Sequence, residues 1–225
     1  MKELLNSSVG RKMLVAVSGQ FMILFIIVHV LGNSTVFFGG LNSYAEKLHS
    51  LPLLVWNTRI LMSIILVVHV FFSIQVTREN WQSKPDSYAV TKNLRSTFAS
   101  RNMIWTGAVI GTFLVFHLLH FTFQIINPSF AASANMDALG RPDVTLMVVS
   151  SFQHFLASFI YIASMVGLAL HLIHGIQSSF QTLGINNESA MPFVTKAGSV
   201  AAIILFLGYV AIPVIILLGL LKGEQ

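Results

Sequence analysis

The sequence contains no cysteine and few charged residues. Without cysteine there can be no disulfides, no thiolate-ligated iron–sulfur clusters and no thioether attachment of c-type haem. Charged residues make up 9% of the 225 residues and apolar residues 55%, a balance that a water-soluble domain of this size could not cover with polar surface. We therefore expect a membrane protein, in which any metal must use His, Met or oxygen ligands.

Five apolar stretches are long enough to cross a bilayer, which takes about 20 helical residues. They cover residues 13–38, 53–76, 102–127, 146–177 and 197–221. The first stretch lacks the small-residue cleavage site of a signal peptide, so we expect it to be a retained helix. The connecting loops are too short for a second domain. The sequence thus predicts one all-α integral membrane bundle of five transmembrane helices over residues 1–225.

The basic residues predict an orientation. With the N-terminus in the cytoplasm, nine Lys and Arg lie in inner segments and four lie outside, as the positive-inside rule requires. The same rule accounts for the net charge of +5, so we expect no nucleic-acid partner. We expect a multi-pass protein of the cell inner (cytoplasmic) membrane. Residues 79–100, with Lys84, Lys92 and Arg95, form the one inner loop large enough to dock a soluble partner.

Histidine is concentrated in the apolar stretches. Seven of the eight histidines fall in or at the edges of the predicted spans: His29, His69, His117, His120, His154, His171 and His174. A single intramembrane histidine is often a hydrogen-bonded packing residue. Histidine on each of four consecutive helices, without carboxylate partners, instead indicates a shared ligand that takes neutral imidazole nitrogen.

Two of these histidines lie at the same depth in the outer half of the membrane. His29 follows Lys12 by 17 residues and His117 follows Arg101 by 16 residues. At 1.5 Å per residue, both lie about 25 Å from the inner charged boundary. We call them the outer pair.

Two others lie nearer the cytoplasm. His69 precedes Arg78 by nine residues, about 13 Å of helix. His171 precedes Gly184 by thirteen residues, about 19 Å on straight-helix geometry, and tilt would bring it to the level of His69. We call His69 and His171 the inner pair. The two pairs predict two b-type haems, each held by two histidines and enclosed by the first four helices.

Spacing leaves some ligand choices open. His120 and His174 follow His117 and His171 by three residues, on nearly the same helix face, so each could be the ligand instead. The histidines that do not bind iron, with His154, could contact haem propionates or could be hydrogen-bonded packing residues.

The chain resembles, over nearly its whole length, the dihaem cytochrome b membrane anchors of succinate:quinone oxidoreductases and quinol:fumarate reductases. The resemblance rests on Ser7-Ser8-Val9-Gly10-Arg11-Lys12 before Ser18-Gly19 and His29, on Thr106-Gly107 with His117 ten residues after Gly107, and on His171-x-x-His174-Gly175 with Gly184. It implies that His29, His69, His117 and His171 bind the two haem irons. It favours His117 and His171 over His120 and His174, which become candidates for propionate contacts.

The resemblance also implies a place in an enzyme complex. The chain would be the anchor subunit of a succinate dehydrogenase or fumarate reductase whose dicarboxylate site lies on another subunit. The implied partners are a flavoprotein subunit, an iron–sulfur subunit on the cytoplasmic face, membrane lipid and quinone. We expect the quinone to be menaquinone. Two complexes could also form a dimer. Some members carry a glutamate linked to proton movement two residues before the fourth ligand. Here that position is Ala169, so we do not expect that proton route.

A quinone site needs a titratable group, because quinone chemistry moves protons with electrons. Glu46 and His49 lie one turn apart before Leu51-Pro52, at the outer mouth between the first two spans. Related anchors place an acidic residue near position 49. Arg59 could contact a propionate or the quinone, or could extend towards the headgroups. Alternatively, Glu46 and His49 lie on an amphipathic loop helix and face water.

Two other functions fit part of the pattern. One is the cytochrome b subunit of a membrane hydrogenase or formate dehydrogenase, which usually has four spans rather than five. The other is a haem-free transporter lined by histidines, which would need carboxylates at depth that the predicted spans lack.

Overall fold

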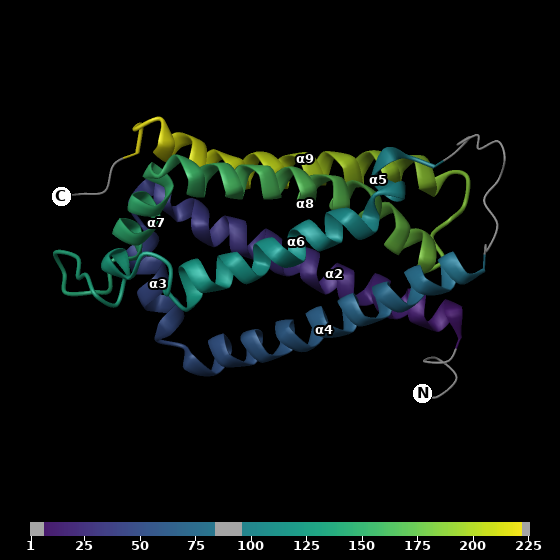
Figure 1. The fold of residues 1–225 in the computed structure, drawn as a ribbon, viewed down its shortest axis with the longest axis horizontal. Coiled ribbons are helices and arrows are strands. Elements are labelled where there is room, and N and C mark those ends of the chain that lie inside the picture. The colour runs from purple at the N-terminus through teal and green to yellow at the C-terminus, as the bar shows by residue number, and fades with distance from the viewer. Residues whose placement is uncertain (1–6, 84–95, 222–225) are drawn as a thin grey trace.

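The computed structural model describes residues 7–83 and 96–221, which form helices joined by loops and one isolated bridge between Met136 and Pro142 (Figure 1). Five helical segments are long and apolar enough to cross a membrane: Ser8–Phe38, Pro52–Gln82, Met103–Thr122, Phe155–Thr182 and Ala190–Leu217. The prediction of an all-α protein with five candidate spans is confirmed. Lys84, Lys92 and Arg95 of the predicted docking loop lie outside the described residues.

The first helix begins earlier, and the second ends later, than predicted. Helix α2 (Ser8–Asn33) starts at Ser7, whose hydroxyl accepts a hydrogen bond from the Gly10 amide, and continues into the 3-10 turn η1 (Ser34–Phe38). After α3 (Leu41–His49), α4 (Pro52–Gln82) runs past the predicted end at residue 76. An ion pair of 2.8 Å between Arg11 of α2 and Glu79 of α4 joins these extra turns. Hydropathy missed them because they are polar.

The third span is shorter than predicted. It consists of α6 (Met103–His117) and a π-helical turn, η2 (Leu118–Thr122), and is preceded by the short helix α5 (Phe98–Arg101). The prediction continued to residue 127, but Gln124 and Asn127 have φ angles of 55° and 57°, which a right-handed helix does not allow. A short 3-10 turn, η3 (Pro128–Phe130), follows.

The stretch predicted as one fourth helix, residues 146–177, is two helices. Helix α7 (Val144–Gln153) ends where His154 adopts an extended ψ of 118°, and α8 (Phe155–Thr182) begins directly after it. The Ser158 hydroxyl donates a hydrogen bond of 2.6 Å to the Phe152 carbonyl, which the break leaves without its helical partner. The predicted fourth helix was therefore longer than a bilayer requires because it covers two helices. The last helix, α9 (Ala190–Leu217), begins seven residues before the predicted start.

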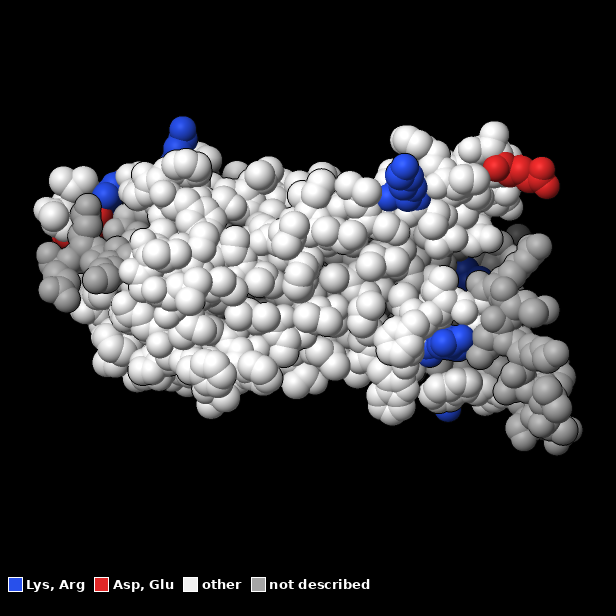
Figure 2. Space-filling view, turned by 90° about the horizontal axis from the view of Figure 1, so that it is seen from above, with Lys and Arg blue, Asp and Glu red and all other residues white. Residues whose placement is uncertain are grey.

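Helix α8 is the centre of the bundle, packing against α2, α6 and α9, while α4 packs against α2 on one side (Figure 1). We call the end that carries α3 and α7 the outer end and the opposite end the inner end, after the predicted orientation, which stays a prediction. Figure 2 shows charged side chains near the two ends and a broad uncharged band between them. Large hydrophobic side chains such as Leu24, Ile64 and Ile204 are exposed, which suits lipid contact.

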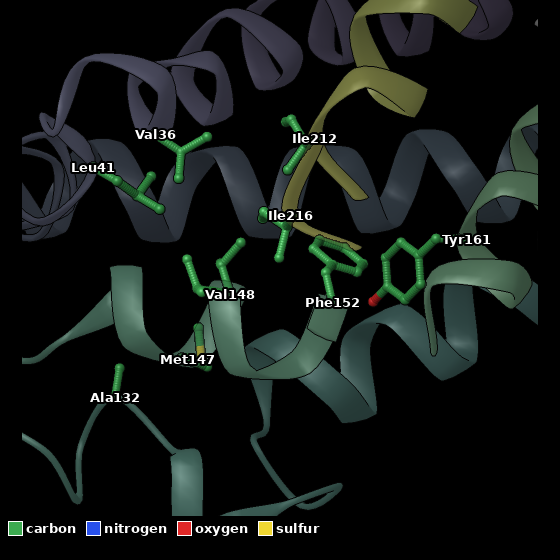
Figure 3. Close-up of a cluster of buried hydrophobic side chains, with 10 residues drawn as sticks. Val36, Leu41, Ala132, Met147, Val148, Phe152, Tyr161, Ile212 and Ile216 are labelled. Atoms are coloured by element: carbon green, nitrogen blue, oxygen red, sulfur yellow. The ribbon is translucent and has the colours of Figure 1, made fainter. Parts of the chain in front are cut away.

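The outer end has its own core (Figure 3). Its buried members come from η1, α3, α7, α8, α9 and the loop before α7: Val36, Leu41, Ala132, Met147, Val148, Val149, Phe152, Tyr161, Ile212 and Ile216. A second cluster joins α2, α8 and α9 nearer the inner end: Val30, Leu172, Ile176, Ala202 and Leu205. The first cluster holds α7 against the ends of α6 and α8.

The absence of native cysteine makes the orientation testable with single-cysteine variants. We expect Leu139→Cys, in the exposed loop before α7, to react with a membrane-impermeant maleimide in right-side-out vesicles. Glu188→Cys, exposed between α8 and α9, should react only after the vesicles are opened. The reverse pattern would invert the orientation, and labelling of both variants from one side would be inconsistent with the span between them.

Candidate functional site

The inner pair lies between α4 and α8. The ring centres of His69 and His171 are 6.4 Å apart, with their planes at 64°. Gly19 of α2 and Gly107 of α6 face these rings: an added Cβ would lie 3.3 Å from Cε1 of His69 and 3.6 Å from Cε1 of His171, respectively. The absence of a side chain at Gly19 therefore lets α2 approach the imidazole of α4 closely.

Hydrogen bonds determine which nitrogen of His69 carries the hydrogen. Its Nδ1 lies 3.2 Å from the Val15 carbonyl oxygen and 3.1 Å from Ser18 Oγ. A carbonyl only accepts, so Nδ1 must be the donor. The Ser18 hydroxyl donates to the Leu14 carbonyl at 2.6 Å, which leaves its oxygen free to accept. Nε2 of His69 consequently keeps its lone pair, the form that a metal requires.

His171 is held in a similar way by the other facing helix. Its Nδ1 lies 3.1 Å from Thr106 Oγ1. The Thr106 hydroxyl has its own acceptors on α6, the carbonyls of Asn102 and Met103 at 3.2 and 3.1 Å. If that hydrogen goes to either carbonyl, Nδ1 of His171 is the donor to Thr106 and Nε2 keeps its lone pair. A hydroxyl residue followed by glycine thus contacts each inner histidine.

The outer pair lies between α2 and α6. The ring centres of His29 and His117 are 5.9 Å apart and nearly perpendicular, at 87°. Phe25 stacks on His29 with ring centres 5.5 Å apart, and Phe113 lies 5.8 Å from His117. Nδ1 of His117 lies 3.3 Å from the phenolic oxygen of Tyr161 on α8. The depth argument therefore grouped side chains that do lie together.

His120 has protein partners on both ring nitrogens. It is 2% exposed, with Nδ1 3.1 Å from the Tyr161 phenol and Nε2 3.1 Å from Ser151 Oγ of α7. Its ring also stacks on Phe121 with centres 4.2 Å apart. Because no nitrogen is left for a metal, this geometry favours His117 over His120 as the ligand, a choice that spacing left open.

The donor set of each pair matches a metal that brings further ligands of its own. Among residues 7–83 and 96–221, no group of three or more His, Cys, Asp or Glu side chains is placed to hold a metal ion. With a metal–nitrogen bond of about 2 Å, two imidazoles on opposite sides of one metal have ring centres about 6 Å apart. The observed 5.9 and 6.4 Å agree. Haem iron, with four macrocycle nitrogens, fits such a pair.

The remaining candidates for propionate contacts occupy different surroundings. His174 is half-buried one turn after His171, whereas His154 is exposed at the break between α7 and α8. Arg59 is exposed on α4, with its guanidinium carbon 5.2 Å from the ring centre of Trp56. Stacking on a neighbour of the same helix suits the interpretation that Arg59 extends towards the headgroups.

The two quinone-site candidates lie on α3 and have separate partners. Glu46, with a side chain 58% exposed, lies 3.4 Å from the Arg141 guanidinium. His49 is exposed, and its Nδ1 donates to the Ala45 carbonyl at 2.8 Å. Both side chains reach the surface of the outer end. Their role in quinone chemistry stays a prediction.

Arg141 belongs to a polar cluster that sequence reasoning missed. Asp137 Oδ1 accepts from the backbone amides of Leu139 and Arg141 at 3.0 and 2.9 Å, and its Oδ2 lies 2.7 Å from the Arg141 guanidinium. Asn42 of α3 donates to Asp137 and Asp143, which ties the loop to α3. The hydrogen bond from the Arg141 side chain is the largest cause that lowers the pKa of Asp137, to about 2. The Asp-x-x-x-Arg spacing was the available signal.

Tyr161 and Ser151 were also missed. Both are buried, with exposures of 7% and 1%. The signal was a tyrosine and a serine within a long apolar stretch, because a buried phenol or hydroxyl needs a hydrogen-bond partner. Hydropathy treats such residues as parts of the span, so they did not stand out.

Comparisons with protein-family models, with curated proteins and with solved structures give no match to this chain.

Acid should loosen the loop held by Asp137. Because its pKa is lowered from 3.8 to about 2 in the fold, the ionised carboxylate stabilises the loop fully above about pH 4, and this contribution is lost as the pH falls through about 2. We expect Asp137→Asn to accelerate hydrogen exchange of the Leu139 and Arg141 amides at pH 7, measured by mass spectrometry. Glu46→Gln, which removes the longer ion pair, is the control. Equal exchange in wild type and Asp137→Asn would contradict this assignment.

Proposed function

We propose that this chain is the dihaem cytochrome b anchor of a succinate dehydrogenase or fumarate reductase complex, passing electrons between an iron–sulfur subunit and membrane quinone. The observation that carries the proposal is the pairing of four histidines from four different helices, with ring centres 5.9 and 6.4 Å apart. In each pair, the distance between the two ring centres suits one iron, and both histidines lie within candidate transmembrane helices.

The orientation of the rings supports haem over packing histidines. In three of the four, Nδ1 lies within 3.3 Å of an oxygen on a neighbouring helix: His69, His117 and His171. A metal-bound histidine characteristically donates its other ring hydrogen to such an oxygen, which sets the tautomer and the ring plane. For His69 the Val15 carbonyl requires the hydrogen on Nδ1, which leaves Nε2 without one.

The residues of the chain have three tasks in this proposal. His69 with His171 and His29 with His117 would hold the haem irons through ring nitrogens, Ser18 and Thr106 would orient the inner rings, and the surrounding apolar helices would exclude water. When bound, haem supplies one-electron chemistry, and the low dielectric around it lets ligand hydrogen bonds adjust its reduction potential. Two centres at different depths could carry electrons across much of the bilayer.

The motifs that carry the family resemblance coincide with residues that contact the inner pair. Ser18-Gly19 meets His69, and Thr106-Gly107 meets His171. This coincidence supports the assignment to succinate and fumarate complexes over other cytochromes b. The same assignment supplies the proposed partners: flavoprotein and iron–sulfur subunits at the inner end, and quinone, with menaquinone proposed, near the outer pair.

The purified chain should contain two non-covalent b haems with low-spin spectra, because two histidine pairs are present and cysteine is absent. We expect His29→Ala or His117→Ala to remove one haem, and His69→Ala or His171→Ala to remove the other. Pyridine haemochrome absorbance against protein concentration gives the stoichiometry, and low-temperature spectra identify which haem is lost.

His154→Ala is the control, because this exposed histidine makes no side-chain capping bond at the start of α8. It should retain both haems. A wild-type ratio near one, or no haem, would reject the dihaem proposal. Loss of the same haem from the His29→Ala and His69→Ala variants would reject the pairing.

Quinone turnover tests the outer-end site. We expect Glu46→Gln or His49→Ala to lower quinone-linked turnover of the whole complex by about 10²-fold, the contribution of a general acid or base. Both haems and dye-linked succinate oxidation or fumarate reduction should remain, since neither side chain contacts a histidine pair in the described structure. Lys47→Ala, an exposed neighbour on α3, is the matched control. Full quinone activity in the Glu46→Gln/His49→Ala double variant would place the site elsewhere.

A further inference from the structure

Helices α6, α7 and α8 and the π-helical turn η2 contribute to one buried hydrogen-bond chain beside the outer pair. From His117 of α6 the contacts run to the Tyr161 phenol of α8 at 3.3 Å, from that phenol to Nδ1 of His120 at 3.1 Å, and from Nε2 of His120 to Ser151 Oγ of α7 at 3.1 Å. Tyr161, His120 and Ser151 are 7%, 2% and 1% exposed. Their polar atoms therefore depend on one another rather than on water.

Counting hydrogens gives this chain one direction. If Nε2 of His117 binds a metal, its hydrogen is on Nδ1, which then donates to the Tyr161 oxygen. The single phenolic hydrogen is left for Nδ1 of His120, and the remaining hydrogen of His120, on Nε2, donates to Ser151. In the opposite direction Tyr161 would donate to His117 and leave a hydrogen on its Nε2, where it would block metal binding.

We infer that Tyr161 is the positioning residue for the outer haem ligand His117, and that His120 and Ser151 hold the Tyr161 phenol in its accepting orientation. This inference rests on the proposed function. It gives His120 a role that is neither ligand nor propionate contact. It also distinguishes the two centres, because the inner rings are oriented by hydroxyls whose hydrogens go to carbonyls of their own helices.

A second tyrosine near the same pair provides a contrast. The ring of Tyr209 on α9 lies 6.3 Å from that of His29, but its phenol donates to the Ile26 carbonyl at 2.7 Å. Both tyrosines thus border the outer pair, and in the described contacts only Tyr161 bonds a predicted ligand. Tyr209→Phe is therefore a matched control for the loss of a phenol.

The Tyr161 oxygen should affect the iron through the ligand. A histidine that donates its second hydrogen to an oxygen becomes a more basic ligand and favours the oxidised metal. Tyr161→Phe removes that acceptor while retaining the ring that packs in the outer core (Figure 3). The ring plane of His117 also loses its restraint. Both effects would be confined to the haem that His117 binds.

The test is potentiometry and electron paramagnetic resonance of the purified wild-type and variant proteins, which do not depend on turnover. In Tyr161→Phe we expect a rise in the reduction potential and a changed largest g value for one haem, the one lost in His117→Ala, with no change in the other. Tyr209→Phe should change neither haem. Nor should Ser164→Ala, which deletes an α8 hydroxyl bonded to the Ile160 carbonyl.

Ser151→Ala provides a second, smaller change at the far end of the chain. It should shift the same haem in the same direction but by less than Tyr161→Phe, so the test does not depend on that variant folding. Two unchanged haems in both variants would overturn the inference. Equal shifts in Tyr161→Phe and Tyr209→Phe would also overturn it, because they would indicate a packing effect. Wild-type protein without haem would instead reject the proposed function.

Discussion

A neutral imidazole inside a membrane must satisfy one donor nitrogen and one acceptor nitrogen without help from water. Much of the arrangement of α2, α4, α6 and α8 follows from this requirement. Oxygens of neighbouring helices lie within 3.3 Å of Nδ1 in His69, His117 and His171. Donation from Nδ1 to these oxygens would leave the Nε2 atoms for the proposed shared ligand. The helices must approach closely enough for short hydroxyl side chains to reach the rings, and at Gly19, beside Ser18, an added Cβ would lie only 3.3 Å from the His69 ring.

The two pairs are supported by different kinds of structure. The inner pair contacts the hydroxyls of Ser18 and Thr106. Each hydroxyl also donates to a carbonyl one turn earlier on its own helix, so its position depends on that helix alone. The outer pair relies on Tyr161, which is buried in the core that joins α7, α8 and α9. The Tyr161 phenol contacts His117 of α6 and His120 of η2, and His120 in turn contacts Ser151 of α7. A change in the packing of the outer end would therefore affect the outer pair more than the inner pair.

The break at His154 places α7 beside the outer pair. A continuous helix would carry residues 144–153 straight on from α8, away from α6. The extended residue turns α7 back over the ends of α6 and α8, where Ser151 meets His120 and Phe152 meets Tyr161. The Ser158 hydroxyl compensates the carbonyl freed at the break, so no proline or glycine is needed. Asp137, Arg141 and Asn42 then tie the preceding loop to α3.

The sequence alone predicted the number of candidate spans and the position of each histidine along its helix, because hydropathy and helical rise depend only on the order of residues. It therefore grouped His29 with His117 and His69 with His171, which the ring contacts bring together. Tertiary structure decided what depends on contacts between helices. These are the break inside residues 146–177, the polar turns joined by Arg11 and Glu79, and the hydrogen-bond partners of each ring. The spacing of three residues could not show whether His117 or His120 is the better candidate ligand. The structure favours His117, because Tyr161 and Ser151 approach from other helices and contact both ring nitrogens of His120.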